Sequence, residues 1–212
     1  SDTGEMHAVS YDFGEYVNGL GQVHYVTIDS NGKLIKDQII ETPSRPMVHD
    51  CAITKNYVLI FDLPVTFNLG RRDDDNNPIG GDYPVVWNDK HISRVGLQNK
   101  KTDEIIWIEV NPGFLFHIVN SYEDDNGQVV LDFCRYERLF DFDNPLPMGQ
   151  KPFLTRWILD PKTKTCSEEM LDDRPMEFSR VHPDFDGKQH RFGYLLNDGS
   201  CLLYTSPSPR DE

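Results

Sequence analysis

The sequence lacks several features that would place it in a familiar functional class. No apolar run approaches the ~20 residues of a transmembrane helix. Lys and Arg number 21 against 35 Asp and Glu, so the chain has no basic excess with which to bind nucleic acid. It has neither a glycine-rich phosphate loop nor the Gly-x-Ser-x-Gly motif of hydrolases. The composition, 38% hydrophobic and 26% charged, predicts a soluble globular chain.

Cysteine is scarce and widely spaced. No CxxC pair occurs, which argues against a zinc knuckle. We expect free thiols in a reducing compartment, although a disulfide pair stays open at this point. The four cysteines are Cys51, Cys134, Cys166 and Cys201.

What the sequence does contain is a succession of short strand patterns joined by Gly, Asn, Asp and Pro turns. The strands are predicted at 6–11, 23–29, 34–41, 48–54, 57–62, 88–97, 104–110, 116–123, 128–133 and 153–159. Only 168–171 suggests a helical turn, and 70–84 and 141–152 are expected to be long surface insertions. This pattern predicts an all-β fold, and four-stranded antiparallel units repeated radially would make a propeller.

Two histidines occupy matching places in this pattern. His49 and His117 each open a strand-like run that is followed by a turn and a second run. One such histidine would be uninformative, but a matching pair is how a repeated β architecture directs ligands to a central point. Imidazole is a common ligand of transition metals, so the pair predicts a metal site. The two rings should converge, and a separation beyond ~8 Å would exclude two nitrogens held at about 2.1 Å from one metal.

Four stretches resemble the carotenoid cleavage oxygenase family, which includes the retinal pigment epithelium isomerase and the lignostilbene dioxygenases. They are TGEMHA at 3–8, VHD at 48–50 with NY at 56–57 and FDLP at 61–64, NPGFLFHIVNSYE at 111–123, and EFSR at 177–180. The third is the most specific. The resemblance covers residues 3–198.

The resemblance implies a seven-bladed β-propeller with Fe(II) on its axis, held by four histidines that glutamates orient from behind. His49 and His117 would be two of the iron ligands. Glu177 would accept the other ring N–H of a ligand histidine, with His117 the expected partner, at about 2.6–3.2 Å. Such a glutamate should be substantially buried.

The chain also departs from the family pattern. Ser179 stands where the family motif has proline, and the remaining glutamates behind the histidines are not matched. The first and fourth iron histidines would lie before Ser1 and near the C-terminus of a full protein. We therefore expect an internal piece of the enzyme, a partial propeller over 1–200. Residues 201–212 are expected to be a non-native tail, in which 204–212 pack against nothing, and a natural Ser/Pro linker is the alternative.

The function implied by the resemblance is iron-dependent cleavage of a conjugated carbon–carbon double bond. The partners would be dioxygen and an apolar carotenoid, apocarotenoid or stilbene, giving two carbonyl products. Membrane-surface contact is not readable from this chain. The alternatives are a family member that isomerises its substrate, and a non-enzymatic propeller scaffold. The other five histidines, including His182 just beyond Glu177, are expected to be ordinary strand or loop residues.

Overall fold

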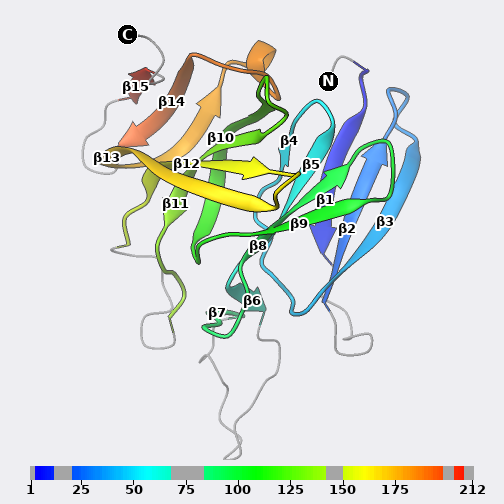
Figure 1. The fold of residues 1–212 in the computed structure, drawn as a ribbon, viewed down its shortest axis with the longest axis horizontal. Coiled ribbons are helices and arrows are strands. Elements are labelled where there is room, and N and C mark those ends of the chain that lie inside the picture. Colours follow the sequence, from blue (N-terminus) through cyan, green and yellow to red (C-terminus); the bar gives the residue numbers. More distant parts are fainter. Residues whose placement is uncertain (1–2, 12–20, 68–83, 142–149, 198–202, 208–212) are drawn as a thin grey trace, which may run out of the picture.

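The fold of the described residues is built from antiparallel strands (Figure 1). The computed structural model describes residues 3–11, 21–67, 84–141, 150–197 and 203–207. A three-stranded sheet contains β1 (Met6–Tyr11), β2 (Gly21–Ile28) and β3 (Leu34–Thr42). A four-stranded sheet contains β4 (Ala52–Ile53), β5 (Tyr57–Asp62), β8 (Arg94–Asn99) and β9 (Ile105–Glu109), with a small ribbon of β6 (Val65–Phe67) and β7 (Val85–Trp87) beside it. The predicted all-β class is confirmed.

The C-terminal part is a longer succession of paired strands. It contains β10 (Phe114–Glu123), β11 (Val129–Tyr136), β12 (Phe153–Asp160), β13 (Thr165–Val181), β14 (Phe192–Asn197) and β15 (Leu203–Pro207). β13 pairs with β12 along its first part and with β14 from Met176 onward. Between these parts, Thr155 faces Met170 while Phe153 faces Pro175, so β13 carries a long bulge. This one strand therefore leaves the β10–β12 sheet and opens the next sheet.

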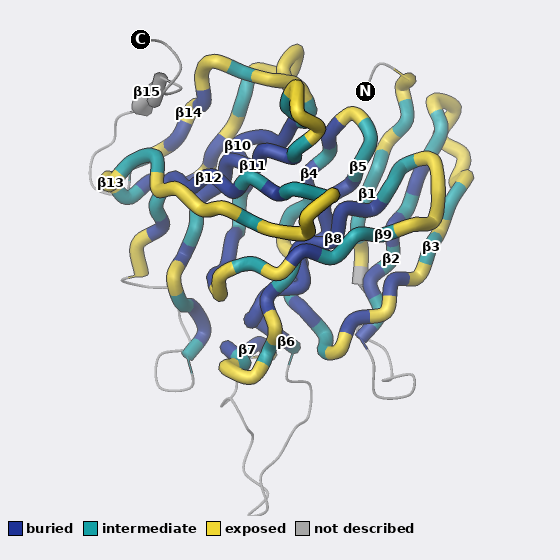
Figure 2. The backbone as a smooth tube through the Cα atoms, viewed as in Figure 1, coloured by how far each residue is buried: buried dark blue, intermediate teal, exposed yellow. Residues whose placement is uncertain are grey.

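The hydrophobic cores lie between neighbouring sheets rather than inside any one of them. Val23, Tyr25, Val58 and Ile60 pack between the first sheet and the second. A larger cluster joins the second sheet to the β10–β12 sheet, and a third lies against β13 and β14. In Figure 2 the strands in the middle of the molecule, such as β8 and β11, are mainly buried, and the ends of the hairpins are exposed. Sheets packed face to face in sequence are the architecture of a propeller.

Burial patterns along single strands follow from this arrangement. β2 alternates buried and half-buried residues, because one of its faces packs against a neighbouring sheet. β5 and β11 are buried at nearly every position, because sheets cover both of their faces. The structure thus accounts for the run VVLDF in β11, which is apolar except for Asp132, a buried carboxylate paired with Arg156.

Two hairpins use the same turn chemistry. Asp29 Oδ1 accepts hydrogen bonds from the backbone N–H of Asn31 and of Lys33, each at 2.9 Å, and Gly32 has a φ of 82°. These bonds hold the pKa of Asp29 below its usual value. Asp124 and Gly127 repeat the arrangement between β10 and β11. Glycine suits both turns because it adopts positive φ without steric cost.

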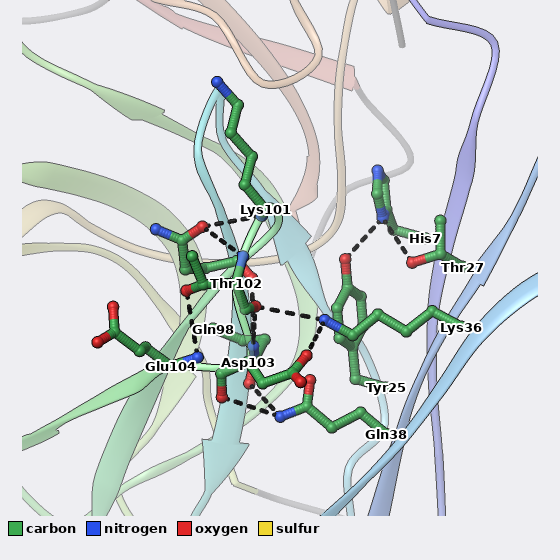
Figure 3. A network of polar contacts seen from close by, with 11 residues as sticks. His7, Tyr25, Thr27, Lys36, Gln38, Gln98, Lys101, Thr102, Asp103 and Glu104 are labelled. Atoms are coloured by element: carbon green, nitrogen blue, oxygen red, sulfur yellow. Dashed lines mark hydrogen bonds and ion pairs between the residues drawn. The ribbon is translucent and has the colours of Figure 1, made fainter.

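Polar contacts add to the apolar packing between the first two sheets (Figure 3). Lys36 Nζ lies 2.9 Å from Asp103 Oδ1, in the turn between β8 and β9. Gln38 Nε2 donates to the backbone oxygen of Asp103 at 3.0 Å. On the other side of β2, the hydroxyl of the buried Tyr25 lies 2.9 Å from His7 Nδ1. The contacts of Lys36 and Gln38 fix β3 against the β8–β9 turn, whereas the contact between Tyr25 and His7 joins β2 to β1 within the first sheet.

Some expectations from the sequence were wrong. Residues 168–171 are strand, because they lie within β13, where residues 168–170 pair with β12 from Trp157 to Thr155. Residues 203–207 do not stand apart, since β15 pairs with β14 along its backbone. The assignment of 201–212 as a non-native tail stays a prediction. Most of 70–84 and 141–152 lies outside the described residues.

Two further observations concern composition. Cys51, Cys134 and Cys166 are free thiols, as expected, and Cys201 lies outside the described residues. Burial raises the pKa of the Cys51 thiol to about 11. Within the described ranges, no helix has the length and hydropathy to cross a membrane.

Candidate metal centre

The two histidines singled out in the sequence reach the centre from different kinds of backbone. His117 lies within β10, at a bulge where the pairing with β11 shifts register between Leu115 and Ile118. His49 does not open a strand, because the residues before β4 have no regular structure. Bulges re-aim side chains, so the irregular backbone at both positions is consistent with rings turned out of the normal alternation.

The structure brings these two rings together. The ring centroids of His49 and His117 lie 5.5 Å apart, and the ring planes are inclined at 83°. β4 and β10 lie at the edges of different sheets. The expected convergence is confirmed as geometry, whereas metal ligation by the two rings stays a prediction.

Hydrogen bonds fix which ring nitrogen of His49 is free. His49 Nδ1 lies 2.9 Å from the backbone oxygen of Phe116. A carbonyl oxygen can only accept, so Nδ1 carries a proton, and in the neutral imidazole Nε2 keeps its lone pair. The ring edge that could bind a metal is therefore Nε2.

His117 also carries its proton on Nδ1, although the acceptor is a different residue. Its Nδ1 donates to Glu177 Oε2 at 2.6 Å, and Glu177 is only 8% exposed. The predicted contact and the predicted burial are both confirmed. A carboxylate in this position fixes the tautomer of the imidazole and raises the basicity of the opposite nitrogen.

Phe178 completes the environment of Glu177. Its backbone N–H donates to the same Glu177 Oε2 at 2.6 Å. Phe178 has a φ of 51°, unusual for a residue with a side chain, and its ring centroid lies 4.9 Å from that of His117. Glu177 Oε1 is buried and has no hydrogen-bond partner within the described part of the chain. The strained backbone thus places an N–H on the carboxylate and an aromatic ring against the histidine.

Asp50 joins the two histidine segments. Its Oδ2 accepts from the backbone N–H of Ile118 at 3.2 Å, and its Oδ1 accepts from that of Cys51. Burial raises the pKa of the Asp50 carboxyl, against the effect of these hydrogen bonds. Sequence reasoning assigned no role to Asp50 or Phe178, although each directly follows a residue that it did single out.

Aromatic side chains line the β10 side of the centre. The Phe116 ring lies edge-on to His49, at 5.0 Å between centroids, and also contacts Phe114 and Tyr136. Phe114 is fully buried. The Phe116 ring thus covers one side of His49, while the His49 residue as a whole is exposed and His117 is half-buried.

The remaining described histidines have other partners. His91 lies 3.0 Å from Asp62 Oδ1, and His24 lies 2.7 Å from Asp37 Oδ1. His190 accepts from Asn120 Nδ2 at 3.1 Å, and His7 contacts Tyr25. His182 caps the 3-10 turn Pro183–Phe185, where its ring accepts from a backbone N–H. None of these five lies in the pair formed by His49 and His117.

The donor set of the described residues is incomplete for a metal. No group of three or more His, Cys, Asp or Glu side chains converges anywhere in these ranges. Two imidazoles with free Nε2 atoms, one of them held by a buried carboxylate, nevertheless fit part of a histidine site. Their chemistry suits a first-row transition metal.

Comparison with known proteins identifies the family. The family model described as retinal pigment epithelial membrane protein (RPE65) matches residues 1–203. The chain belongs to the RPE65/carotenoid cleavage oxygenase family. It is 33% identical, over 95% of its length, to a carotenoid cleavage oxygenase of Mycobacterium tuberculosis. It is 29% identical, over 89% of its length, to resveratrol cleavage oxygenase 1 of Chaetomium globosum.

A solved structure shows the same fold. The structure of the cobalt-substituted apocarotenoid oxygenase of Synechocystis matches 95% of the present chain, with a TM-score of 0.76 and 23% sequence identity. The chain covers 43% of that protein, 47% of the Mycobacterium relative and 37% of the Chaetomium relative. The chain therefore spans less than half of each of these three proteins and corresponds to a part of the Synechocystis propeller.

Proposed function

We propose that the protein to which this chain corresponds is a non-haem Fe(II) dioxygenase that cleaves a conjugated carbon–carbon double bond. The double bond is replaced by two carbonyl groups, whose oxygens come from dioxygen. The observation that carries the proposal is the pair of imidazoles at 5.5 Å, in which each Nδ1 is bonded to an oxygen acceptor. His49 and His117 would be two of the iron ligands.

Each residue of the centre has a separate task in this proposal. The Phe116 carbonyl and the Glu177 carboxylate hold the Nδ1 protons, so that both rings present Nε2 in fixed orientations. The Phe178 N–H holds Glu177 in place from behind. When bound, the iron supplies the activation of dioxygen. The protein supplies ligands, orientation and an aromatic wall, and it needs no general base of its own.

The substrate class follows from the aromatic surroundings and from the relatives. Phe116 and Phe178 place apolar rings beside the two imidazoles, which suits a flat, conjugated, apolar molecule. The names of two relatives refer to cleavage of carotenoids and of resveratrol, a stilbene. A carotenoid, an apocarotenoid or a stilbene is therefore proposed as the substrate.

A longer chain that restores the propeller tests this function. It is loaded with Fe(II) and incubated with a carotenoid or a stilbene under ¹⁸O-labelled dioxygen, and the products are analysed by mass spectrometry. Labelled carbonyl products support the proposal. Recovery of a rearranged substrate without label would identify an isomerase, and a folded longer chain that binds no iron would identify a scaffold.

A further inference from the structure

The distance between the two candidate ligands is set across a junction between sheets. We call this junction the β4–β10 seam. It comprises Asp50, Ile53, Thr54 and Asn56 on one side and Ile118, Ser121 and Glu123 on the other. β4 and β10 are edge strands of separate sheets, so no backbone ladder holds them in register. Side-chain hydrogen bonds do so instead.

The bonds of the seam run along the whole length of the contact. Asp50 Oδ2 accepts from the Ile118 N–H at 3.2 Å, next to the histidines. Further along, Ser121 Oγ donates to the Ile53 carbonyl at 2.8 Å. Each of these pairs a side chain with the backbone of the opposite strand, which fixes both the spacing and the register of the two strands.

Glu123 ends the seam with its densest set of contacts. Its Oε1 accepts from Thr54 Oγ1 at 2.6 Å and from the Asn56 backbone N–H at 2.7 Å, and its Oε2 accepts from Asn56 Nδ2 at 2.7 Å. Thr54 is 2% exposed. One carboxylate thus holds three donors of the turn that joins β4 to β5. Hydrogen bonds to a charged acceptor are roughly twice as strong as those between neutral groups.

We propose that Glu123 is a positioning residue for the metal centre, acting through the β4–β5 turn on His49. His117 lies on the same strand as Glu123, roughly 20 Å earlier along it by strand geometry. β4 follows directly after the irregular segment that carries His49. Fixing the β4–β5 turn against β10 therefore fixes where His49 stands relative to His117. This inference rests on the proposed function for its ligand pair.

The test uses Cu(II) with the 212-residue chain, because Cu(II) binds imidazole more strongly than Fe(II) does. Electron paramagnetic resonance counts the imidazole nitrogens on the metal, and calorimetric titration gives the affinity. We expect two coordinated imidazoles in the native chain and one in His117→Ala. In Glu123→Ala we expect one imidazole and an affinity lower by about tenfold, the lower end of the range for groups behind a ligand.

Two variants separate positioning from loss of stability. In Glu123→Gln the glutamine oxygen can still accept from Thr54 and from the Asn56 backbone N–H. The glutamine NH₂ can donate to the Asn56 side-chain oxygen once that amide has rotated. This variant should therefore retain both coordinated imidazoles. Glu168→Ala removes a similarly bonded carboxylate, which accepts from Trp157 Nε1 at 2.6 Å on the outer part of β13, and should also retain both. Thermal unfolding shows that each variant is folded.

A second measurement needs no metal. Nitrogen chemical shifts of labelled histidine report the tautomer of His49, which is Nδ1–H while Phe116 O accepts from it. Glu123→Ala should raise the Nε2–H fraction, and Glu123→Gln should not. If the native chain coordinates no imidazole pair while this tautomer shift persists, the proposed ligand pair fails and the positioning role stands. Two imidazoles and an unchanged tautomer in Glu123→Ala, or equal losses in Glu168→Ala, would overturn the positioning role.

Discussion

The Glu177 carboxylate and the His117 imidazole share a hydrogen bond of 2.6 Å although they are 60 residues apart in the sequence. Removing the charge should weaken the hold on the Nδ1 proton and lower the basicity of Nε2. We expect Glu177→Gln to reduce metal affinity by about 10–100-fold, measured by titration with Cu(II). Glu168→Gln is the control, and an unchanged affinity in Glu177→Gln would contradict the role of the carboxylate.

Iron should distinguish the 212-residue chain from a longer one. Two imidazoles hold Fe(II) more weakly than four, so the present chain should take up no stoichiometric iron and cleave no alkene. A longer chain that contains all four ligands should bind stoichiometric iron and cleave the alkene. Within it, His117→Ala should abolish iron binding, whereas His182→Ala should leave it intact, as metal analysis would show. Stoichiometric iron in the present chain would refute this expectation.

The buried pair of Arg156 and Asp132 should matter for stability. Arg156 Nε and Nη2 donate to the two carboxylate oxygens at 2.7 and 2.8 Å, and both side chains are largely buried. Arg156→Met leaves an unpaired buried charge, which costs about 3–5 kcal/mol. Denaturant unfolding measures this cost. The double variant Arg156→Met/Asp132→Leu should recover much of the loss, and a cost below about 1 kcal/mol for the single variant would be inconsistent with this account.

Stability should depend on pH through His190. Burial lowers the pKa of His190 below 6.5, assisted by the nearby Arg156 and opposed by Asp132. The unfolded chain therefore binds this proton first as pH falls. The contribution is fully present above pH 6.5 and is lost as pH falls from there through the folded-state pKa.

His190→Asn should flatten this part of the pH profile. The asparagine oxygen can replace Nδ1 as the acceptor for Asn120, so stability at neutral pH should change little. Burial also lowers the pKa of His7, which leaves a smaller residual slope. Urea unfolding between about pH 5 and pH 8, the range in which histidine side chains change charge, measures both effects. An unaltered slope in His190→Asn would exclude His190 as its source.

The turn between β12 and β13 offers a stabilising substitution. Lys164 has a φ of 57°, a conformation that favours glycine. Its side chain is exposed, so little packing is lost on truncation. A side chain in this conformation costs about 1–2 kcal/mol, whereas the added freedom of glycine in the unfolded chain costs about 0.5–1 kcal/mol. Lys164→Gly should therefore raise the free energy of unfolding by up to about 1 kcal/mol. Lys162→Gly in the same turn is the control and should not stabilise the protein.

Local pattern and motif were enough to place most strands and the two histidines. Alternation and Asn-Gly turns are encoded within a few residues, and the motif around His117 is long enough to be specific. The error at 168–171 arose because Glu168 and Glu169 favour helix locally, whereas their structure is decided by pairing with β12.

The rest of the centre depends on contacts between distant segments. Glu123 meets Asn56 across 67 residues, and nothing in either local sequence specifies the partner. The positive φ of Phe178 follows a strand-like pattern that predicts ordinary extended backbone. Such features come from packing between sheets, which a single sequence does not display.

The long bulge in β13 allows the pairing of this strand with β12 and its pairing with β14 to have independent registers. Between Thr165 and Met170 the strand must match β12, and from Met176 it must match β14 and present Glu177. The residues between Met170 and Pro175 are not paired with β12. Insertions or deletions among them therefore need not turn Glu177 to the opposite face of the sheet. Chain length can therefore drift at the outer edge of this sheet during evolution while the residue behind His117 keeps its place.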